Sequence, residues 1–266
     1  MQLLEAVADV VLAAGRLIEE VRARASLHVS QKGNEGPVTE ADRRSDDWLK
    51  RELTRLEPAA WLSEETADDK SRLAQRRLWV VDPLDGTKEF IAGIPEYAIS
   101  VALVEDGEAV LGVIHNPANG ETYTALRGAG ARRNGQRIQT AAGSLVLASR
   151  SEMKSGEFTP FVDAGFELRP MGSIAYKLAL IARGDAAVTL SRGPKWEWDV
   201  CAGGLLVTEA GGNATDVFGT PLRYNQAFPK VRGILAGEPV AYERAREFVA
   251  RVGASDRMAE FEGGGR

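Results

Sequence analysis

Apolar residues recur at intervals of three and four along residues 3–21, which is the spacing of a helix with one buried face. The same spacing over residues 39–56 predicts a second amphipathic helix. Thr39 suits the N-cap of this helix, and Asp42 three residues later lies near its positive end. A polar, glycine-containing loop is expected between the two helices, at residues 30–37.

After the second helix, the pattern changes to short apolar runs that are typical of strands. These runs occupy residues 59–62, 78–81, 97–104, 109–114 and 121–126. Asp106-Gly107 and Asn134-Gly135 are dipeptides that favour tight hairpin turns, so antiparallel pairing is expected around them. The first half of the chain is therefore predicted to place helices on an antiparallel sheet.

The second half alternates between strand and helix patterns. Short strands are expected at residues 145–148 and 186–190, and helices at residues 173–182, 199–210 and 239–252. We therefore predict a layered α+β fold with two closely packed subdomains, residues 1–140 and residues 141–252. Residues 253–266 contain three consecutive glycines and little apolar content, so a flexible tail is expected there.

Composition narrows the class of protein. The 266 residues are 44% hydrophobic and 27% charged, as in globular domains, with a net charge of -5. This acidic balance argues against a nucleic-acid polymer as partner. The one cysteine, Cys201, excludes an intramolecular disulfide and a CxxC zinc site. No signal-peptide order or membrane-spanning apolar run is found, so we expect a cytoplasmic protein without a membrane partner.

Three acidic clusters carry the candidate chemistry. They are Ser63-Glu64-Glu65-Thr66, Asp82-Pro83-Leu84-Asp85-Gly86-Thr87 and Trp196-Glu197-Trp198-Asp199. Two carboxylates at the end of a buried run resist joint ionisation unless a cation joins them. The carboxylates of the second cluster, the Leu84 carbonyl and the Thr87 hydroxyl are oxygen donors, which suit Mg²⁺.

Each cluster alone has a simpler interpretation. Asp82 and Asp85 could cap a turn, Glu64 and Glu65 could lie in a solvated loop, and Asp199 could be the N-cap of a helix. The combination favours a ligand site, because all three clusters lie where a strand ends or a helix begins.

The three clusters also occur in an order that resembles a known superfamily. It is the Mg²⁺-dependent, lithium-sensitive phosphatase superfamily of inositol monophosphatase, fructose-1,6-bisphosphatase and 3'(2'),5'-bisphosphate nucleotidase. The resemblance extends from Pro37-Val38-Thr39-Glu40-Ala41-Asp42 to Glu209-Ala210-Gly211-Gly212. It implies a layered αβαβα sugar-phosphatase-like architecture and hydrolysis of a small phosphomonoester. Family members are often homodimers, but no motif in this chain decides that point.

The resemblance implies two or three Mg²⁺ ions in each active site. The implied ligands are Glu64, Asp82, the Leu84 carbonyl and Thr87 for the first ion, Asp82, Asp85 and Asp199 for the second, and Glu64 and Asp42 for a weaker third. Thr87 and Asp42 correspond to the pair that helps to activate the attacking water in the family. Glu64 is expected to be catalytic with them.

The segment Lys88-Glu89-Phe90 resembles bisphosphate nucleotidases of the CysQ type, which implies hydrolysis of 3'-phosphoadenosine 5'-phosphate to AMP and phosphate. The second phosphate of such a substrate requires cationic contacts. The expected substrate-binding residues are Gly86, Thr87, Ser173, Lys177, Arg192, Lys195, Asp199 and Arg223. Arg192 lies where inositol phosphatases often carry an acidic residue, and this difference disfavours inositol.

Other functions stay open at this stage. The main rival enzyme is an inositol-1-monophosphatase of broad specificity, and hydrolysis of histidinol phosphate or fructose bisphosphate is less favoured. A non-catalytic metal or nucleotide sensor on the same fold is the rival from another class. Any one of the basic residues could equally lie on a solvated face.

Overall fold

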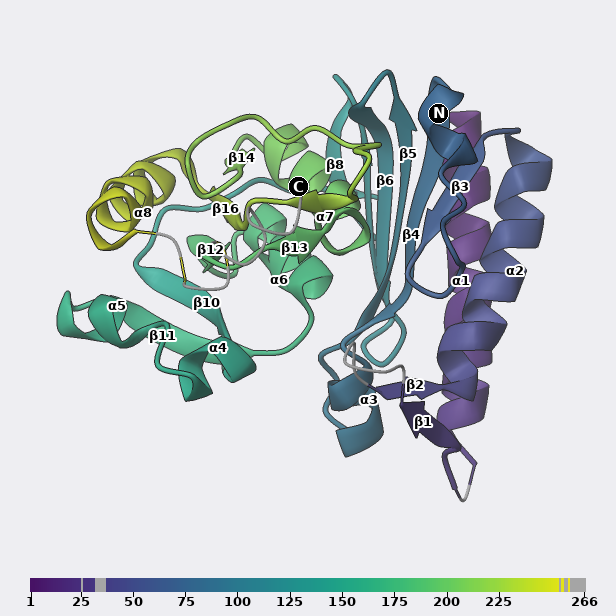
Figure 1. The fold of residues 1–266 in the computed structure, drawn as a ribbon, viewed down its shortest axis with the longest axis horizontal. Helices are drawn as coiled ribbons and strands as arrows, with labels where there is room; N and C mark the ends of the chain where they lie inside the picture. The colour runs from purple at the N-terminus through teal and green to yellow at the C-terminus, as the bar shows by residue number, and fades with distance from the viewer. Residues whose placement is uncertain (25, 32–36, 254, 256–257, 259–266) are drawn as a thin grey trace.

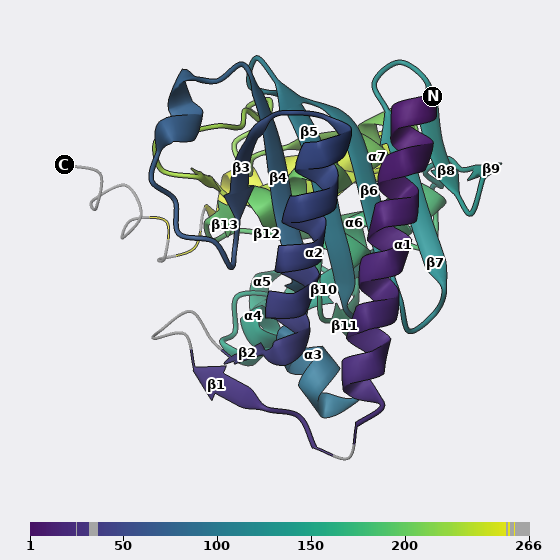
Figure 2. The ribbon, with the colours of Figure 1, turned by 90° about the vertical axis from the view of Figure 1, so that its right-hand side faces the viewer.

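The two segments near the start of the chain that have helical spacing of apolar residues form two long helices. The computed structural model describes residues 1–24, 26–31, 37–253, 255 and 258, and it places α1 at Gln2–Arg22 and α2 at Glu40–Leu56. Both helices cover the same face of the large sheet and lie side by side (Figures 1 and 2). The predicted cap of α2 is confirmed, because the Thr39 hydroxyl accepts from Ala41 N–H while Asp42 accepts from Thr39 N–H.

The large sheet has seven strands in the order β3-β4-β5-β6-β7-β8-β9. Their bounds are Ala60–Ser63, Arg77–Asp85, Ala98–Glu105, Glu108–Asn116, Glu121–Leu126, Gly130–Arg133 and Gln136–Arg137. The predicted antiparallel pairing is confirmed except between β3 and β4, which are parallel. Asp106-Gly107 and Asn134-Gly135 have positive φ at both positions, as their two-residue turns require.

Two helices form the middle layer, α6 at Ile174–Arg183 and α7 at Glu197–Glu209. Both are buried on almost every side, which fits their nearly continuous apolar sequence. Helix α7 begins two residues earlier than the sequence predicts, with Trp196 at its N-cap. Asp199 is therefore not the N-cap but the third helical residue, and its carboxylate accepts from Trp196 N–H at 3.1 Å.

A second sheet lies beyond this middle layer, in the order β11-β10-β12-β16-β14 (Figure 1). Its strands are Glu167–Met171, Leu145–Ser149, Val188–Ser191, Ile234–Gly237 and Asn213–Thr215. The outer face of this sheet carries α5 (Thr159–Asp163) and α8 (Pro239–Val252), and α4 (Arg150–Lys154) directly follows the end of β10. The five layers confirm the predicted αβαβα architecture, and the chain passes from the first sheet to the second between Arg137 and Leu145.

Several short elements complete the fold. They are β1 (Val29–Gln31), β2 (Pro37–Thr39), the 3₁₀ turn η1 (Ser71–Ala74), α3 (Thr87–Ala92), β13 (Lys195–Trp196) and β15 (Lys230–Val231). The expected loop at residues 30–37 and the expected tail at residues 253–266 fall largely outside the described residues.

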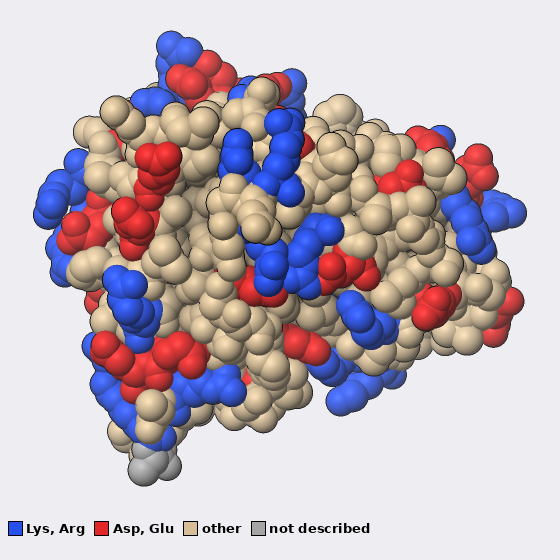
Figure 3. All heavy atoms as spheres, turned by 180° about the vertical axis from the view of Figure 1, so that it is seen from behind, with Lys and Arg blue, Asp and Glu red and all other residues tan. Residues whose placement is uncertain are grey.

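The described surface mixes charges of both signs. Lys and Arg side chains alternate with Asp and Glu over the face in Figure 3. Among the residues that the structure describes, no helix is both long and apolar enough to cross a membrane.

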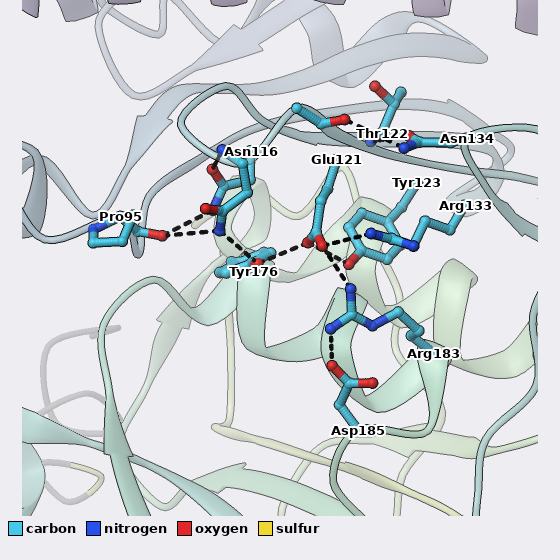
Figure 4. Close-up of polar contacts among 12 residues, drawn as sticks. Pro95, Asn116, Glu121, Thr122, Tyr123, Arg133, Asn134, Tyr176, Arg183 and Asp185 are labelled. Carbon is cyan, nitrogen blue, oxygen red and sulfur yellow. Dashed lines mark hydrogen bonds and ion pairs between the residues drawn. The ribbon is translucent and has the colours of Figure 1, made fainter.

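A buried carboxylate joins the first sheet to the middle layer. Glu121 on β7 accepts hydrogen bonds from the hydroxyls of Tyr123 and Tyr176, both at 2.7 Å (Figure 4). Its other oxygen accepts from Arg133 at 2.8 Å and from Arg183 at 2.6 Å. The side chain is only 10% exposed, so these four donors satisfy a charge that would otherwise be costly to bury.

We predict that Glu121→Ala lowers the free energy of unfolding by about 2–4 kcal/mol, because it leaves buried donors without an acceptor. Urea denaturation measures this change. The matched control is Glu108→Ala, since Glu108 also pairs with two arginines but is 40% exposed. That control should cost about 0.5 kcal/mol or less. Equal losses in the two variants would contradict a special role for the buried carboxylate.

Candidate active site

The central acidic cluster lies at the end of β4, where the strand becomes irregular. Side chains three residues apart in a regular strand point to opposite faces. The pairing of β4 with β5 shifts register between Asp82 and Asp85, which interrupts this alternation. Both carboxylates can therefore line the same cavity.

This cavity has a volume of about 800 Å³ and lies where β4 and α3 face α4, α6 and the start of α7. The residues expected from the sequence that line it are Glu64, Asp82, Leu84, Asp85, Gly86, Thr87, Ser173, Lys177, Lys195 and Asp199. Trp196 and Trp198 of the third cluster line it too, as do residues that the sequence did not single out, among them Arg150, Lys154 and Lys230. The fold thus brings together carboxylates and ammonium groups from segments more than a hundred residues apart.

The carboxylates in the cavity strongly disfavour one another's ionisation. Burial raises the pKa of Asp82 well above its usual range, and the charges of Glu64, Asp85 and Asp199 raise it further. Burial and then the charge of Asp85 raise the pKa of Asp199 to about 7. A cation among these oxygens would remove both effects.

Hydrogen bonds from the chain hold these carboxylates in place. Asp85 accepts from the Ser173 hydroxyl at 2.6 Å and from Ala175 N–H at 2.7 Å, both through one oxygen. Asp82 accepts from Leu84 N–H at 2.9 Å. In the part of the chain that the structure describes, no three His, Cys, Asp or Glu side chains are grouped closely enough to hold a metal as they stand. The donor set fits a hard cation, because it consists of oxygens alone.

Thr87 and Asp42 are in direct contact. The Thr87 hydroxyl lies 2.9 Å from Asp42 Oδ1 and 3.0 Å from the Leu84 carbonyl, so its single hydrogen has two acceptors in reach. Asp42 is 2% exposed, and burial raises its pKa, which makes it a better proton acceptor than an exposed aspartate. Asp42 does not line the cavity itself and reaches it through Thr87.

Gly86 is the N-cap of helix α3, with φ of 93°, and an added Cβ there would lie 2.7 Å from the Glu96 carbonyl oxygen. Glycine therefore suits this position, which lets the chain turn sharply there, and both Gly86 and Thr87 line the cavity.

Two of the four predicted basic residues lie in the cavity. Lys177 is 3% exposed, and burial is the main cause that lowers its pKa to about 8. Lys195 pairs with the buried Glu152 at 3.0 Å. These two ammonium groups face the side of the cavity that holds Asp85, since both lower the pKa of that carboxyl group.

Arg192 and Arg223 are not brought to the cavity, so the expected grouping of four basic residues does not hold. Arg192 turns away and donates to the backbone carbonyls of Gly253 at 3.0 Å and Glu157 at 2.7 Å. Arg223 pairs with Glu108 at a separate surface depression. A sequence shows which residues are basic but not which way the chain turns their side chains.

This fold and site define a phosphatase, and residues 1–253 match the inositol monophosphatase family. The chain belongs to that family and is a phosphomonoester hydrolase. It is 38% identical to the inositol-1-monophosphatase of Rhizobium meliloti, over 73% of this chain and 77% of that protein. It is 34% identical to the 3'(2'),5'-bisphosphate nucleotidase CysQ of Aggregatibacter actinomycetemcomitans, over 76% of this chain and 80% of that protein.

Solved structures agree with this assignment. The inositol monophosphatase (IMPase) of Thermotoga maritima superposes with a TM-score of 0.82 at 30% sequence identity. The match covers 95% of this chain and 98% of that one.

The raised pKa of Asp199 predicts a pH-dependent stability in the presence of a chelator. Its folded pKa of about 7 exceeds the unfolded value of 3.8, so the folded wild type loses stability as pH rises between these values. Asp199→Asn carries no such cost. We therefore expect the variant to gain stability relative to the wild type from pH 4 to pH 7 and to level off above, as urea denaturation with EDTA would measure.

The quantity to compare is the difference in free energy of unfolding between variant and wild type at each pH. The buried His115, whose pKa is lowered to about 4, makes both proteins more stable as pH rises and so acts against the effect of Asp199. Asp106→Asn is the control, since Arg76 lowers the pKa of Asp106 and the small pH dependence that results lies at the acidic end of this window. A constant difference between Asp199→Asn and wild type from pH 4 to pH 7 would contradict the prediction.

Proposed function

We propose that the chain is a Mg²⁺-dependent 3'(2'),5'-bisphosphate nucleotidase that converts 3'-phosphoadenosine 5'-phosphate to AMP and phosphate. The observation that carries the proposal is the composition of one cavity, where a wall of carboxylates faces the ammonium groups of Lys177 and Lys195. Carboxylates can bind the cations that hold the reacting phosphate. Ammonium groups can bind further negative charge on the substrate. Away from its phosphate, inositol-1-phosphate carries only neutral hydroxyl groups, so it has less need of ammonium groups in the cavity.

The proposed Mg²⁺ ligands are Glu64, Asp82, the Leu84 carbonyl, Asp85, Thr87 and Asp199, which all line the cavity. Asp42 does not line it, so we propose Asp42 as the partner of Thr87 and not as a direct ligand of a third ion. Bound Mg²⁺ would supply the positive charge that activates a water and neutralises the leaving oxygen. The chain must then orient that water and take its proton.

Thr87 and Asp42 can perform this proton transfer. When the Thr87 hydroxyl donates to Asp42, its oxygen can accept a hydrogen bond from a water in the cavity. A proton can then pass from the water to Thr87 as the hydroxyl proton of Thr87 moves to Asp42. The raised pKa of Asp42 favours this direction. The backbone N–H groups of Gly86 and Thr87 would hold the phosphate being cleaved.

A second candidate is an inositol-1-monophosphatase. It is favoured by the relative from Rhizobium meliloti, which bears that name at 38% identity. The CysQ relative has a similar identity, so sequence similarity does not choose between them. The basic side of the cavity, with Lys177 and Lys195, favours the nucleotide.

Asp82→Asn is expected to lower kcat for Mg²⁺-dependent phosphate release by about a thousandfold or more, because it removes a charge shared by two proposed cation sites. The variant should remain folded, since the neutral amide relieves a carboxylate whose pKa is strongly raised by burial. Phosphate release and thermal unfolding measure the two effects. Near-normal turnover by a folded Asp82→Asn protein would refute the metal assignment.

The substrate is tested by comparing kcat/KM for 3'-phosphoadenosine 5'-phosphate, inositol-1-phosphate and fructose-1,6-bisphosphate with Mg²⁺. We expect the nucleotide to be preferred by about a hundredfold, or roughly 2.7 kcal/mol in the transition state. Comparable or faster turnover of inositol-1-phosphate would keep the metal mechanism and reject the nucleotidase. The absence of Mg²⁺-dependent release from all three would favour another phosphomonoester substrate or a non-catalytic sensor.

A further inference from the structure

Helix α2 buries polar side chains on the face that it turns toward the active site. Asp42, Ser45 and Asp46 occupy positions i, i+3 and i+4, so they lie on one face of the helix. Their exposed fractions are only 2%, 0% and 5%. Aspartate is rarely buried so completely unless it is paired. A polar face of this kind therefore needs an explanation beyond the packing of a core.

Two residues of this face contact the irregular end of β4 and the segment that follows it. Asp42 accepts from the Thr87 hydroxyl at 2.9 Å. The Ser45 hydroxyl donates to the carbonyl of Pro83, the residue after Asp82, at 3.0 Å. Helix α2 therefore holds the central acidic cluster at two points.

Asp46 makes the third contact of this face, and it holds a different turn. Its Oδ1 accepts from the Ser63 hydroxyl at 2.5 Å, and its Oδ2 accepts from the Thr66 hydroxyl at 2.8 Å. The two donors lie on either side of Glu64 and Glu65 in the sequence. One carboxylate on a long helix thus closes the turn that presents Glu64 to the cavity.

The position of this turn matters because it lies beside the central acidic cluster. Ser63 pairs with Val81 in the parallel register of β3 and β4, and Glu64 N–H donates to the Val81 carbonyl at 3.3 Å. Glu64 and Asp82 therefore come next to each other at the same end of two parallel strands, and both line the cavity. Strand β3 ends at Ser63, and the hydroxyls bound to Asp46 hold the chain that follows.

We propose that Asp46 is a positioning residue, which holds Glu64 in the place where it binds Mg²⁺. This inference rests on the proposed function, in which Glu64 is a ligand of Mg²⁺, and deepens it. Asp46 does not line the cavity, so it acts through the turn and touches neither cation nor substrate. A ligand that is already held in position loses less conformational freedom on binding, so it binds a cation more tightly.

The test measures Mg²⁺ binding by calorimetric titration of the folded, metal-free protein. Asp46→Ala is expected to raise the Kd for Mg²⁺ by about ten- to a hundredfold, as for loss of a group that orients a metal ligand. Phosphate release should then need correspondingly more Mg²⁺ to reach half of its maximal rate. The matched control is Asp47→Ala, which should leave the Kd unchanged, because Asp47 is the next residue of α2 and is exposed.

A second pair of variants tests the same turn from the side of the donor. Thr66→Val removes one hydroxyl at a half-buried position and should raise the Kd for Mg²⁺ by about two- to tenfold, as for loss of one hydrogen bond. Thr66→Ser keeps the hydroxyl and should bind Mg²⁺ as the wild type does. Thermal unfolding without Mg²⁺ shows whether each variant is folded. A merely structural role for Asp46 would lower this stability but leave the Kd of the folded protein unchanged, which would overturn the proposal.

Glu64→Gln separates the failure of this inference from the failure of the proposed ligand set. If Glu64→Gln binds Mg²⁺ as tightly as the wild type, Glu64 is not a ligand, and the role of Asp46 is rejected with it. If Glu64→Gln binds Mg²⁺ more weakly and Asp46→Ala does not, only the role of Asp46 is rejected. Should Asp46→Ala fail to fold, Thr66→Val decides in its place. Neither result affects the choice between nucleotide and inositol phosphate as substrate.

Discussion

Repulsion among closely grouped carboxylates is the constraint on which this structure depends. Asp82 is buried, Asp85 and Asp199 are half-buried, and all three line one cavity within reach of one another's charge. The repulsion between their charges opposes folding, and hydrogen bonds from the surrounding chain offset part of it. Ser173 and Ala175 N–H fix Asp85, and Leu84 N–H fixes Asp82. Such a site has a high affinity for cations, because a bound cation removes the repulsion between the carboxylates.

The middle layer is what makes this arrangement possible. Helix α7 packs on β4, β5 and β6 of the first sheet and on β14 and β16 of the second. Its first turn places Asp199 opposite the end of β4, and the ladder of β13 and β15 sets the edge of the same cavity. Helix α7 and this ladder thus bring Asp199, Lys195 and Lys230 to the cavity that Asp82 and Asp85 line from β4.

Local patterns in the sequence predicted much of this architecture. Helical spacing gave α1, α2, α6 and α8, and the Asp-Gly and Asn-Gly dipeptides marked turns with positive φ. The parallel pairing of β3 with β4 was not predicted, because a short apolar run does not specify the direction of its neighbour. The start of α7 was placed two residues late, since Asp199 suits the third helical position as well as the cap.

The residues of the candidate site could be predicted where they lie close together in the sequence. They could not be predicted where only the fold brings distant residues together. Asp82, Asp85 and Thr87 share one short loop, so their spacing already indicated a common site. The direction of Arg192 depends on its contacts with Glu157 and Gly253, and the position of Lys230 depends on cross-strand register. Neither dependence leaves a local signal in the sequence.

The shared core has a consequence for how this fold can change over evolution. One continuous set of buried residues contains Leu78 and Ile114 from the first sheet, Leu178 and Leu206 from the middle helices, and Ile234 from the second sheet. Recombination at the connection between Arg137 and Leu145 would therefore not exchange an autonomous module. A second half taken from a relative would have to match the surface that the first sheet presents to α7. New substrate specificity in this architecture is more accessible through single changes at the cavity edge, such as those at β13 and β15, than through exchange of whole halves.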